Sequence, residues 1–429
     1  MSKARVIAVA LLAAVVAALV GVSTAGGARH AKTIAVMAVW TGEEQKSFQA
    51  VLSAFQKQSG VKVKYTSGGD QMPTVLATAV QGGNPPDIAI LAQPGLMNDF
   101  VNKGSLKPIS FVAATMKGNF APVWQQLGTR KGKLYGLIWK GANKSTVWYN
   151  VPAFKNAGIK PPATWPNLLN DAKTLRASGA KAYSIGGADG WTLTDLFENI
   201  YLRQAGPAKY DQLSSHKIKW TDASVKAALK SMGQILGDSG NIAGGTAGAL
   251  QTDFPTSVSQ VFTTPPKASM VFEGDFVAGV ITSSTKAKPV SGFNVFAFPA
   301  IGNSKGDVVG GGDTAVMFKD SPSARALIKF LATPQAGTIW AKRGGFASPN
   351  KRVPATAYPD AIQRTTAVAL ARAKVFRFDM SDLQPASFGG TVGQGEFKLF
   401  QDFLKSPKNV NGIASKLEAA AAKAYAKGK

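Results

Sequence analysis

Cysteine is absent from the 429 residues of this chain, and histidine occurs only at His30 and His216. Without cysteine there can be no disulfide bond and no lipobox cysteine, so we expect no lipid anchor. A metal site built from cysteine and histidine is also excluded. A serine–histidine–aspartate triad would have to use His216, which lies in a polar segment and is expected on the surface. No nucleophile-elbow motif accompanies it.

Phosphate-loop and dinucleotide fingerprints are missing in a usable context. The run Gly310-Gly311-Gly312 follows two valines, but no lysine–serine/threonine pair or helix is expected after it. Carboxylates are present, and a glycosidase needs one on each side of the scissile bond. Because spacing in the sequence does not show whether two carboxylates face each other, a secreted glycosidase stays open as an alternative. The candidates are Asp195, Glu198, Glu273, Asp275 and Asp313.

The charge balance is strongly basic, with 49 lysines and arginines against 24 aspartates and glutamates and a formal net charge of +25. Nucleic-acid-binding proteins concentrate their basic residues in a stripe or a tail. Here the lysines are scattered, and the densest group, Arg130–Lys133, is short. We therefore expect a solvated basic surface and no nucleic-acid partner. A basic protein that binds cell-envelope polysaccharides is a second alternative.

The N-terminus has the pattern of a secretory signal. Lys3 and Arg5 precede an apolar run of 17 residues from Val6 to Val22, and small residues follow. We expect a signal peptide over residues 1–28, with cleavage after Ala25 or Ala28. A membrane anchor is the alternative, because a run of this length is near the lower limit for a span. No later stretch is apolar for long enough, so we expect a soluble periplasmic or secreted protein.

Strand and helix patterns alternate along the rest of the chain. Residues 32–40 predict a strand, and Thr41 and Glu44 have the spacing of a capping box at the start of a helix that ends before Gly60. Strands are also predicted over 61–65 and 87–91, and helices over 72–81 and 95–103, after which the alternation continues. This alternation predicts an α/β fold with a mostly parallel sheet covered on both faces.

The length suits two lobes. We expect an N-lobe of residues 32–142 and 293–341 and a C-lobe of residues 143–292 and 342–429. The chain would cross at Lys140–Lys144, return with strands 293–298 and 315–318, and cross again at Arg343–Phe346. The glycine-rich residues 237–250 predict a loop. A cleft between two lobes joined by a hinge is a favoured ligand site.

Two tryptophans stand out as candidates for stacking on a sugar ring. Any single tryptophan is more often a core residue. Trp40, however, ends a predicted strand just before a helix N-terminus, where α/β folds place ligands. Trp191 follows the segment Gly186-Gly187-Ala188-Asp189-Gly190, which is too rich in glycine to predict a ring buried for stability alone.

At these residues the chain resembles family 1 extracellular solute-binding proteins of carbohydrate ABC transporters, and most closely their α-glucoside-type branch. The resemblance covers essentially the whole mature chain. It implies a two-lobe periplasmic-binding-protein-like fold of type II, the Venus flytrap, and no catalysis, cofactor or metal. It also implies a monomer that delivers a mono- or oligosaccharide to membrane permeases. The matching segments include WTGEEQKSF at 40–48, GGNPPDIAIL at 82–91, GKLYGLIWKGANKSTVWYN at 132–150, GWTLTDLFENIYLRQAGPAKYD at 190–211, GGGDTAVMF at 310–318 and IWAKRGGFASPN at 339–350.

The resemblance also implies a set of ligand-binding positions. They are Trp40, Glu43, Glu44, Asp70, Gln93, Lys144, Trp191, Asp195, Glu273, Phe276, Gly312, Asp313, Arg343 and Phe346. The chain departs from the family pattern where a tryptophan often follows the aspartate at Asp195, and where Asp-Leu-Met-Pro is replaced by Asp382-Leu383-Gln384-Pro385. A tryptophan expected near Gly393–Phe397 is also missing. Such changes would alter the sugar pocket.

Overall fold

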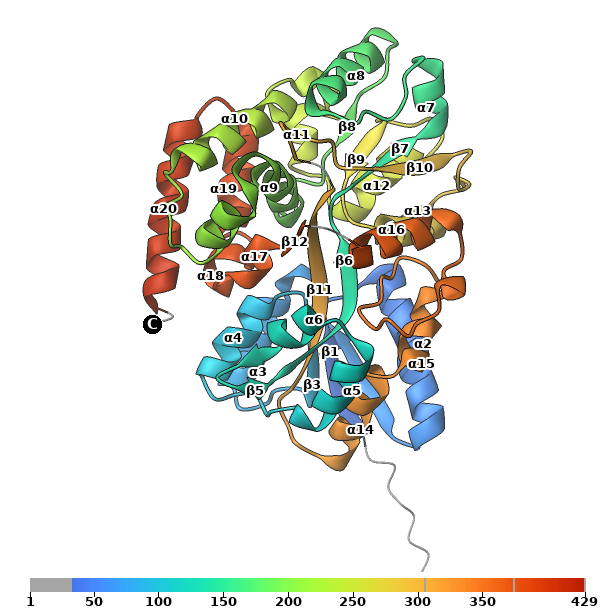
Figure 1. Ribbon diagram of the computed structural model, residues 1–429, viewed down its shortest axis with the longest axis vertical. Helices are drawn as coiled ribbons and strands as arrows, with labels where there is room; N and C mark the ends of the chain where they lie inside the picture. The colour runs from blue at the N-terminus through green and yellow to red at the C-terminus, as the bar shows by residue number, and fades with distance from the viewer. Residues whose placement is uncertain (1–32, 305, 373–374, 428–429) are drawn as a thin grey trace, which may run out of the picture. The chain divides into compact units, whose positions relative to one another are not determined.

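The computed structural model describes residues 33–304, 306–372 and 375–427, which contain two main β-sheets with helices on their faces (Figure 1). The expected signal peptide over residues 1–28 lies outside the described residues. Among the helices that are described, none is both long and apolar enough to cross a bilayer.

The first sheet has the strand order β12-β11-β3-β1-β2, and β6 also pairs with β11. Its strands are β1 (Thr33–Ala38), β2 (Lys62–Ser67), β3 (Ile88–Leu91), β6 (Gly136–Asn143), β11 (Asp307–Met317) and β12 (Val375–Phe378). The second sheet has the order β10-β7-β9-β8. Its strands are β7 (Thr146–Asn150), β8 (Tyr183–Ser184), β9 (Met270–Phe272) and β10 (Phe293–Ala297). A separate hairpin joins β4 (Thr129–Arg130) to β5 (Lys133–Leu134).

The helices fall into three groups along the chain. Around the strands of the first sheet are α2 (Gly42–Ser59), α3 (Met72–Gln81), α4 (Pro94–Asn102), α5 (Ala113–Asn119), α6 (Pro122–Leu127), α14 (Pro322–Leu331) and α15 (Pro334–Ala341). Between β7 and β10 are α7 (Val151–Asn156), α8 (Trp165–Ala177), α9 (Trp191–Ser214), α10 (Ala223–Leu236), α11 (Gly245–Ala249), α12 (Phe254–Phe262) and α13 (Val277–Ser284). Toward the C-terminus are α16 (Ala361–Arg372), α17 (Met380–Leu383), α18 (Ala386–Gly389), α19 (Gly395–Lys405) and α20 (Val410–Lys427). Short 3-10 turns occupy Gly69–Gln71, Ser110–Val112, Ser239–Asn241 and Ala355–Ala357.

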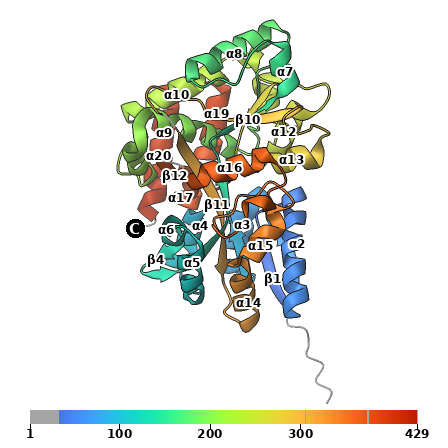
Figure 2. The ribbon, with the colours of Figure 1, turned by 45° about the vertical axis from the view of Figure 1, so that its right-hand side comes forward.

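Strand β3 shows why the first sheet is covered on both faces. All four of its residues are buried, and successive side chains of a strand point to opposite faces. Ile88 and Ile90 join the core formed with α2, α14 and α15, whereas Ala89 and Leu91 join the core formed with α3 and α4. Figure 2 shows α2 and α15 on one side of this sheet and α4 on the other.

The prediction of a mostly parallel sheet is confirmed only for part of the structure. Strand β1 pairs in parallel with β2 and β3, as the strand–helix–strand alternation predicts. Strand β11 pairs antiparallel with β3 and with β6, and in the second sheet β7 is antiparallel to both of its neighbours. A crossover helix joins the parallel neighbours β1 and β2, whereas β11 comes from the second sheet and reaches β3 and β6 without such a crossover.

The first crossing between the sheets lies where the sequence predicts it, since β6 ends at Asn143 and β7 begins at Thr146. The expected return at residues 293–298 is wrong, because Phe293–Ala297 pairs with Asn150–Thr146 in the second sheet. The return to the first sheet is made by β11. The exact lobe boundaries stay a prediction.

Strand β11 is longer than the sequence suggested, because Gly310-Gly311-Gly312 continue it. These glycines pair with Asn143, Ala142 and Gly141 of β6, which satisfies their backbone groups. A side chain has no room there: a Cβ on Gly312 would lie 2.7 Å from Ile138 Cγ2 and 2.9 Å from the Lys140 carbonyl oxygen. Close approach of two strands therefore explains a glycine run that propensity alone assigns to a loop.

Two other segments have a structure that differs in detail from the prediction. The expected loop 237–250 contains the turn Ser239–Asn241 and the short helix α11. The helix expected over 190–204 continues to Ser214 after a kink at Gly206, whose φ of 79° is outside the helical region. The C-terminal helices α19 and α20 pack against α9 and α10 in the core of the second sheet.

Gly312→Ala is expected to destabilise the protein by ~1–3 kcal/mol, because the added methyl group overlaps the backbone of β6. Gly118→Ala is the matched control, since a Cβ at this site in α5 meets nothing within 4 Å. That control should raise the stability by ~0.5–1 kcal/mol. Urea unfolding measures both changes as shifts of the midpoint at constant slope. Equal midpoints for the two variants would contradict the packing argument for β11.

Candidate ligand-binding site

A cavity of about 880 Å³ lies among segments of both sheets. Its walls include the segment after β1, the start of α2, the β6–β7 crossing, the first residue of α9, and α13. Small-molecule sites have volumes of roughly 300–1,000 Å³ and are mostly apolar with a few fixed polar groups. The cavity therefore has the size and position expected of a site for a small ligand.

Most of the predicted ligand-binding residues line this cavity, although they come from positions far apart in the sequence. Asp195, Glu273 and Phe346 do not line it. The predicted residues that the structure brings together there are Trp40, Glu43, Glu44, Asp70, Gln93, Lys144, Trp191, Phe276, Gly312, Asp313 and Arg343.

Two of the three residues outside the lining, Asp195 and Phe346, contact residues that form it. Asp195 is buried in α9, and its Oδ1 lies 3.1 Å from Lys144 Nζ. Glu273 is buried after β9, and burial together with the Asp195 charge raises the pKa of its carboxyl well above the ordinary value. The Phe346 ring stacks on Trp340 with a centroid separation of 5.4 Å.

The carboxylates proposed for a glycosidase do not form a pair in the cavity wall. Asp195, Glu198, Glu273 and Asp275 are buried and are not among the lining residues. Asp313 lines the cavity, but its Oδ2 accepts a hydrogen bond of 3.2 Å from Trp40 Nε1. The structure therefore gives no support to the glycosidase alternative.

Trp40 is both a core residue and a cavity residue. Its side chain is only 3% exposed and makes edge contacts with Phe48, Trp139 and Trp340. The Trp40 carbonyl oxygen also accepts hydrogen bonds from the hydroxyls of Tyr65 and Ser67. A packed aromatic cluster therefore fixes the ring, as expected of a core residue. Trp40 is also among the lining residues, and its contact with a sugar stays a prediction.

Trp191 is the first residue of α9 and is half-buried. Its ring packs against Phe254 and Phe276, with centroid separations of 5.2 and 6.1 Å, and the Lys144 ammonium lies 5.6 Å from its centroid. The preceding Gly190 has a φ of 84°, and a Cβ there would lie 2.6 Å from Phe397 Cβ. This glycine therefore allows the chain to turn tightly and present the indole at the cavity.

Lys140 is a charged residue of the cavity wall that was not predicted from the sequence as a ligand-binding residue. A β-bulge at Trp139 shifts the β6–β11 register, so that Asp313 pairs with Lys140 and Thr314 with Ile138. Such an extra residue re-aims the side chains that follow it. The Lys140 ammonium lies 2.9 Å from Glu44 Oε1 and 3.6 Å from Asp313 Oδ2. Burial lowers the pKa of Lys140, but these two carboxylates raise it, and the net pKa is above its ordinary value.

This ion pair also corrects the capping-box prediction. Thr41 occupies the N-cap position of α2, but its side chain accepts no hydrogen bond from a backbone nitrogen of this helix. Glu44 extends to Lys140 instead of folding back on the helix start. The ion pair between Glu44 and the buried Lys140 ammonium is stronger than a cap hydrogen bond from Glu44 would be. Water can replace that cap hydrogen bond, because the helix end is exposed.

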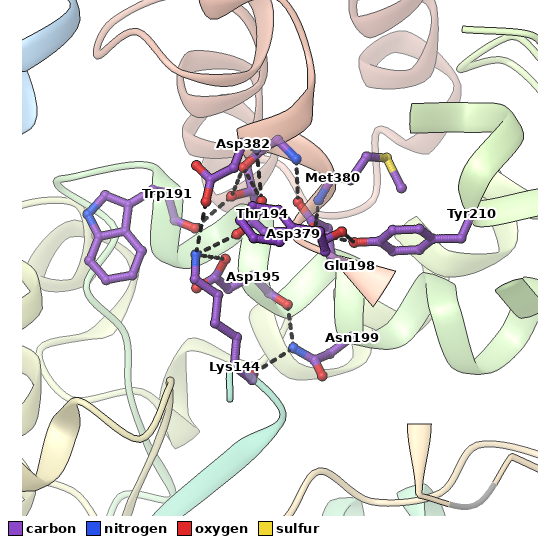
Figure 3. Close-up of polar contacts among 12 residues, drawn as sticks. Lys144, Trp191, Thr194, Asp195, Glu198, Asn199, Tyr210, Asp379, Met380 and Asp382 are labelled. Carbon is purple, nitrogen blue, oxygen red and sulfur yellow. Dashed lines mark hydrogen bonds and ion pairs between the residues drawn. The ribbon is translucent and has the colours of Figure 1, made fainter. Parts of the chain in front are cut away.

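Lys144 lies at the crossing between the sheets and is enclosed by carboxylates (Figure 3). Its Nζ is 3.1 Å from Asp195 Oδ1 and 3.8 Å from Asp382 Oδ2, and it donates a short hydrogen bond to Asp379 Oδ2. Burial lowers the pKa of Lys144, but these three carboxylates raise it well above the ordinary value. The ammonium therefore stays charged inside the protein.

Asp379 is the carboxylate that remains ionised in this group. Burial raises its pKa, but Lys144 and the hydrogen bonds from Asp195, Lys144 and Ser381 lower it to about 2. Its Oδ1 accepts hydrogen bonds from Ser381 Oγ and from the backbone nitrogen of Asp382, and so caps α17. The Lys144–Asp379 pair thus ties the β6–β7 crossing to α17.

Several lining residues were not predicted from the sequence. They include Lys140, Asp189, Trp340 and Asp382. A signal existed for Lys140, because a lysine inside the apolar strand segment GLIWKGAN needs a buried partner. No comparable signal marks Asp189, which lies in a turn, or Asp382, which lies in the short helix α17, because tertiary contacts set both positions.

The arrangement can hold a small ligand that has both an apolar face and hydrogen-bonding edges. Trp191 and Phe276 supply aromatic surface, and the carboxylates and buried lysines fix the polar groups. Within residues 33–304, 306–372 and 375–427, no group of three or more histidine, cysteine, aspartate or glutamate side chains is placed to hold a metal ion.

The chain is similar to known proteins in sequence and in fold. Residues 40–338 match the family model described as bacterial extracellular solute-binding protein. The osmoprotective compounds-binding protein GgtB of Synechocystis is 34% identical over 86% of this chain and 88% of its own length. The alpha-glucosides-binding periplasmic protein AglE of Rhizobium meliloti is 33% identical over 85% of this chain and 82% of its own length.

Among solved structures, the bacterial solute receptor AcbH has a TM-score of 0.81. It is 19% identical and matches over 93% of this chain and all of its own chain, which shows a shared fold. The predicted α/β fold class, with two lobes of the periplasmic-binding-protein-like type, is thereby confirmed. On the extent of the family match and the similarity to its relatives, this chain belongs to the bacterial extracellular solute-binding protein family.

Proposed function

We propose that this protein is the substrate-binding component of an ABC importer, which holds an uncharged mono- or oligosaccharide of α-glucoside type in the cavity. It delivers this ligand to membrane permeases, acts as a monomer and performs no catalysis. The basic and apolar N-terminal segment supports export to the periplasm or the cell exterior. The observation that carries the proposal is the cavity wall in which aromatic rings lie beside fixed charges.

That wall fits the two kinds of surface on a sugar. The apolar face of a pyranose ring packs on an indole or phenyl ring, such as those of Trp191 and Phe276. Ring hydroxyls donate to carboxylates through charge-assisted hydrogen bonds, which are stronger than neutral ones. Carboxylates that line the cavity include Glu44, Asp70 and Asp313. Two curated relatives, named for α-glucosides and for osmoprotective compounds, support a small polar ligand.

The charge distribution supports an uncharged ligand. Lys140 and Lys144 are already paired with carboxylates, so they offer little net attraction to an anion. Lys342 and Arg343 also line the cavity, but the acidic residues there outnumber the four basic ones and would repel phosphates or carboxylates. These acidic residues include Glu43, Glu44, Asp70, Asp189 and Asp313. A neutral polyhydroxy ligand avoids this repulsion.

A thermal-shift screen with maltose, trehalose, sucrose and glucose tests the proposed function. A ligand at 100 times its Kd stabilises the native state by about 2.7 kcal/mol, which corresponds to a rise in Tm of several degrees. We expect at least one of these sugars to raise the Tm, and glucose 1-phosphate to have no effect. If no sugar raises the Tm while an amino acid or a polyamine does, the carbohydrate assignment fails.

Trp191→Ala is expected to weaken sugar binding about tenfold or more, because the ring that packs on the sugar is lost. Trp191→Phe keeps an aromatic face and should recover part of this loss. Isothermal titration calorimetry with the sugar found in the screen measures both affinities.

Trp165→Phe is the matched control, because Trp165 is buried against Phe298 and is not among the lining residues. Its affinity should equal that of the wild type. If Trp191→Ala binds as tightly as this control, Trp191 is not part of the ligand site.

A further inference from the structure

Asp382 has a position in the cavity wall that its salt bridge does not account for. Its side chain is 10% exposed and lines the cavity. Among the described residues, its carboxyl group has one charged partner, Lys144 at 3.8 Å, and makes no side-chain hydrogen bond. Figure 3 shows this carboxyl on the same side of the cluster as Trp191. Its hydrogen-bonding capacity is therefore directed to the cavity.

Lys144 cannot neutralise all the carboxyl groups around it. Asp379 and Asp195 make the closer contacts with its single ammonium, and Asp382 is the farthest of the three. Burying a carboxylate without a cation is costly, and neighbouring buried carboxyls resolve this cost by keeping protons. The group with the weakest contact to the cation is the one that keeps its proton most readily.

The elements packed against α17 add negative charge. They are α4, α9, α18 and β12. The acidic groups that interact with the cluster are Asp195 and Glu198 of α9, Asp313 of β11 and Glu396 of α19. Three nearby cations have other partners: Lys140 pairs with Glu44 and Asp313, Arg377 Nε donates to Asp211 Oδ1, and Lys103 lies over the Phe100 ring. Among the described residues, Lys144 is the cation that contacts Asp195, Asp379 and Asp382.

The backbone of α17 holds Asp382 in this place. Glu198 accepts hydrogen bonds from the backbone nitrogens of Met380 and Ser381, and Asp379 accepts one from the nitrogen of Asp382. Tyr210 also donates to Glu198, from the far side (Figure 3). Because Glu198 and Asp379 both hold the backbone of α17, the Asp382 carboxyl cannot easily move away from its acidic neighbours.

We propose that Asp382 is a further ligand-contacting residue, whose carboxyl group is protonated at neutral pH and donates a hydrogen bond to an oxygen of the bound carbohydrate. The contact with carbohydrate rests on the proposed function, whereas the protonation state does not. A neutral carboxyl both donates and accepts, so it can bond a sugar oxygen and a neighbouring hydroxyl together.

The electrostatics agree with this geometry. Burial raises the pKa of Asp382, the Asp379 charge raises it further, Lys144 lowers it, and the net pKa is well above the ordinary value. Ligand binding through the protonated form should be constant below this pKa. Binding should weaken as the pH rises through it, because the ionised group no longer donates.

Infrared difference spectroscopy of the ligand-free protein at pH 7 tests the protonation state. The wild-type spectrum minus that of Asp382→Asn should show the carbonyl stretch of a protonated carboxylic acid. A carboxylate stretch in its place would overturn the proposal. This measurement uses no sugar, so its result is independent of the proposed function.

Calorimetric titration of the variants with maltose, or with another of the four sugars if maltose does not bind, tests the contact. Asp382→Leu should weaken binding tenfold or more, and Asp382→Asn, which is neutral and still donates, should recover most of that loss. Asp320→Asn, at an exposed pair with Arg325, is the control and should bind like the wild type.

Each remaining outcome decides one part of the proposal. Wild-type affinity in Asp382→Leu would show that Asp382 does not contact the ligand. Equal losses in the leucine and asparagine variants would contradict a hydrogen bond donated by a neutral side chain at this position. If the wild type binds none of the four sugars, the proposed function and the contact fail together, and the infrared result still decides the protonation state.

Discussion

The buried ammonium of Lys144 joins three segments that are distant in the sequence. It lies at the crossing from β6 to β7, pairs with Asp195 of α9, and donates to Asp379 at the start of α17. A buried ion pair gains little net stability over apolar packing, but leaving one partner alone costs ~3–5 kcal/mol. The pairing therefore acts mainly by fixing which segments meet. The cavity wall containing Trp191 and Asp382 depends on that meeting.

A second constraint is the close approach of β11 and β6, which glycines permit. These two strands carry the chain between the regions of the two sheets, as Figure 1 shows. The bulge at Trp139 breaks their register, and next to it Lys140 reaches Glu44 and Asp313. Backbone geometry thus sets the position of Lys140, and pairing with carboxylates holds Lys144. Each places a charge beside an aromatic ring, which is the combination that a sugar requires.

The sequence was sufficient for features set by local physics. The helix over Met72–Gln81 has the predicted bounds, and Gly60 has the left-handed conformation of a helix C-terminus. The crossing near Lys144 also followed from the pattern of strands. The placement of β10 in the second sheet, the extension of β11 through three glycines, and the entry of Asp382 into the cavity depend on neighbours far away in the chain. Periodicity carries no information on such contacts, so these features could not be predicted.

We propose that a carbohydrate binds in the cavity between Trp191 and the Lys144 cluster. A crystal structure of the protein grown with the sugar that gives the largest thermal shift tests it most directly. We expect a pyranose ring packed on the Trp191 indole, with a ring or hydroxyl oxygen within hydrogen-bonding distance of the Asp382 carboxyl. A sugar bound at another surface, with this cavity holding only water, would contradict the account.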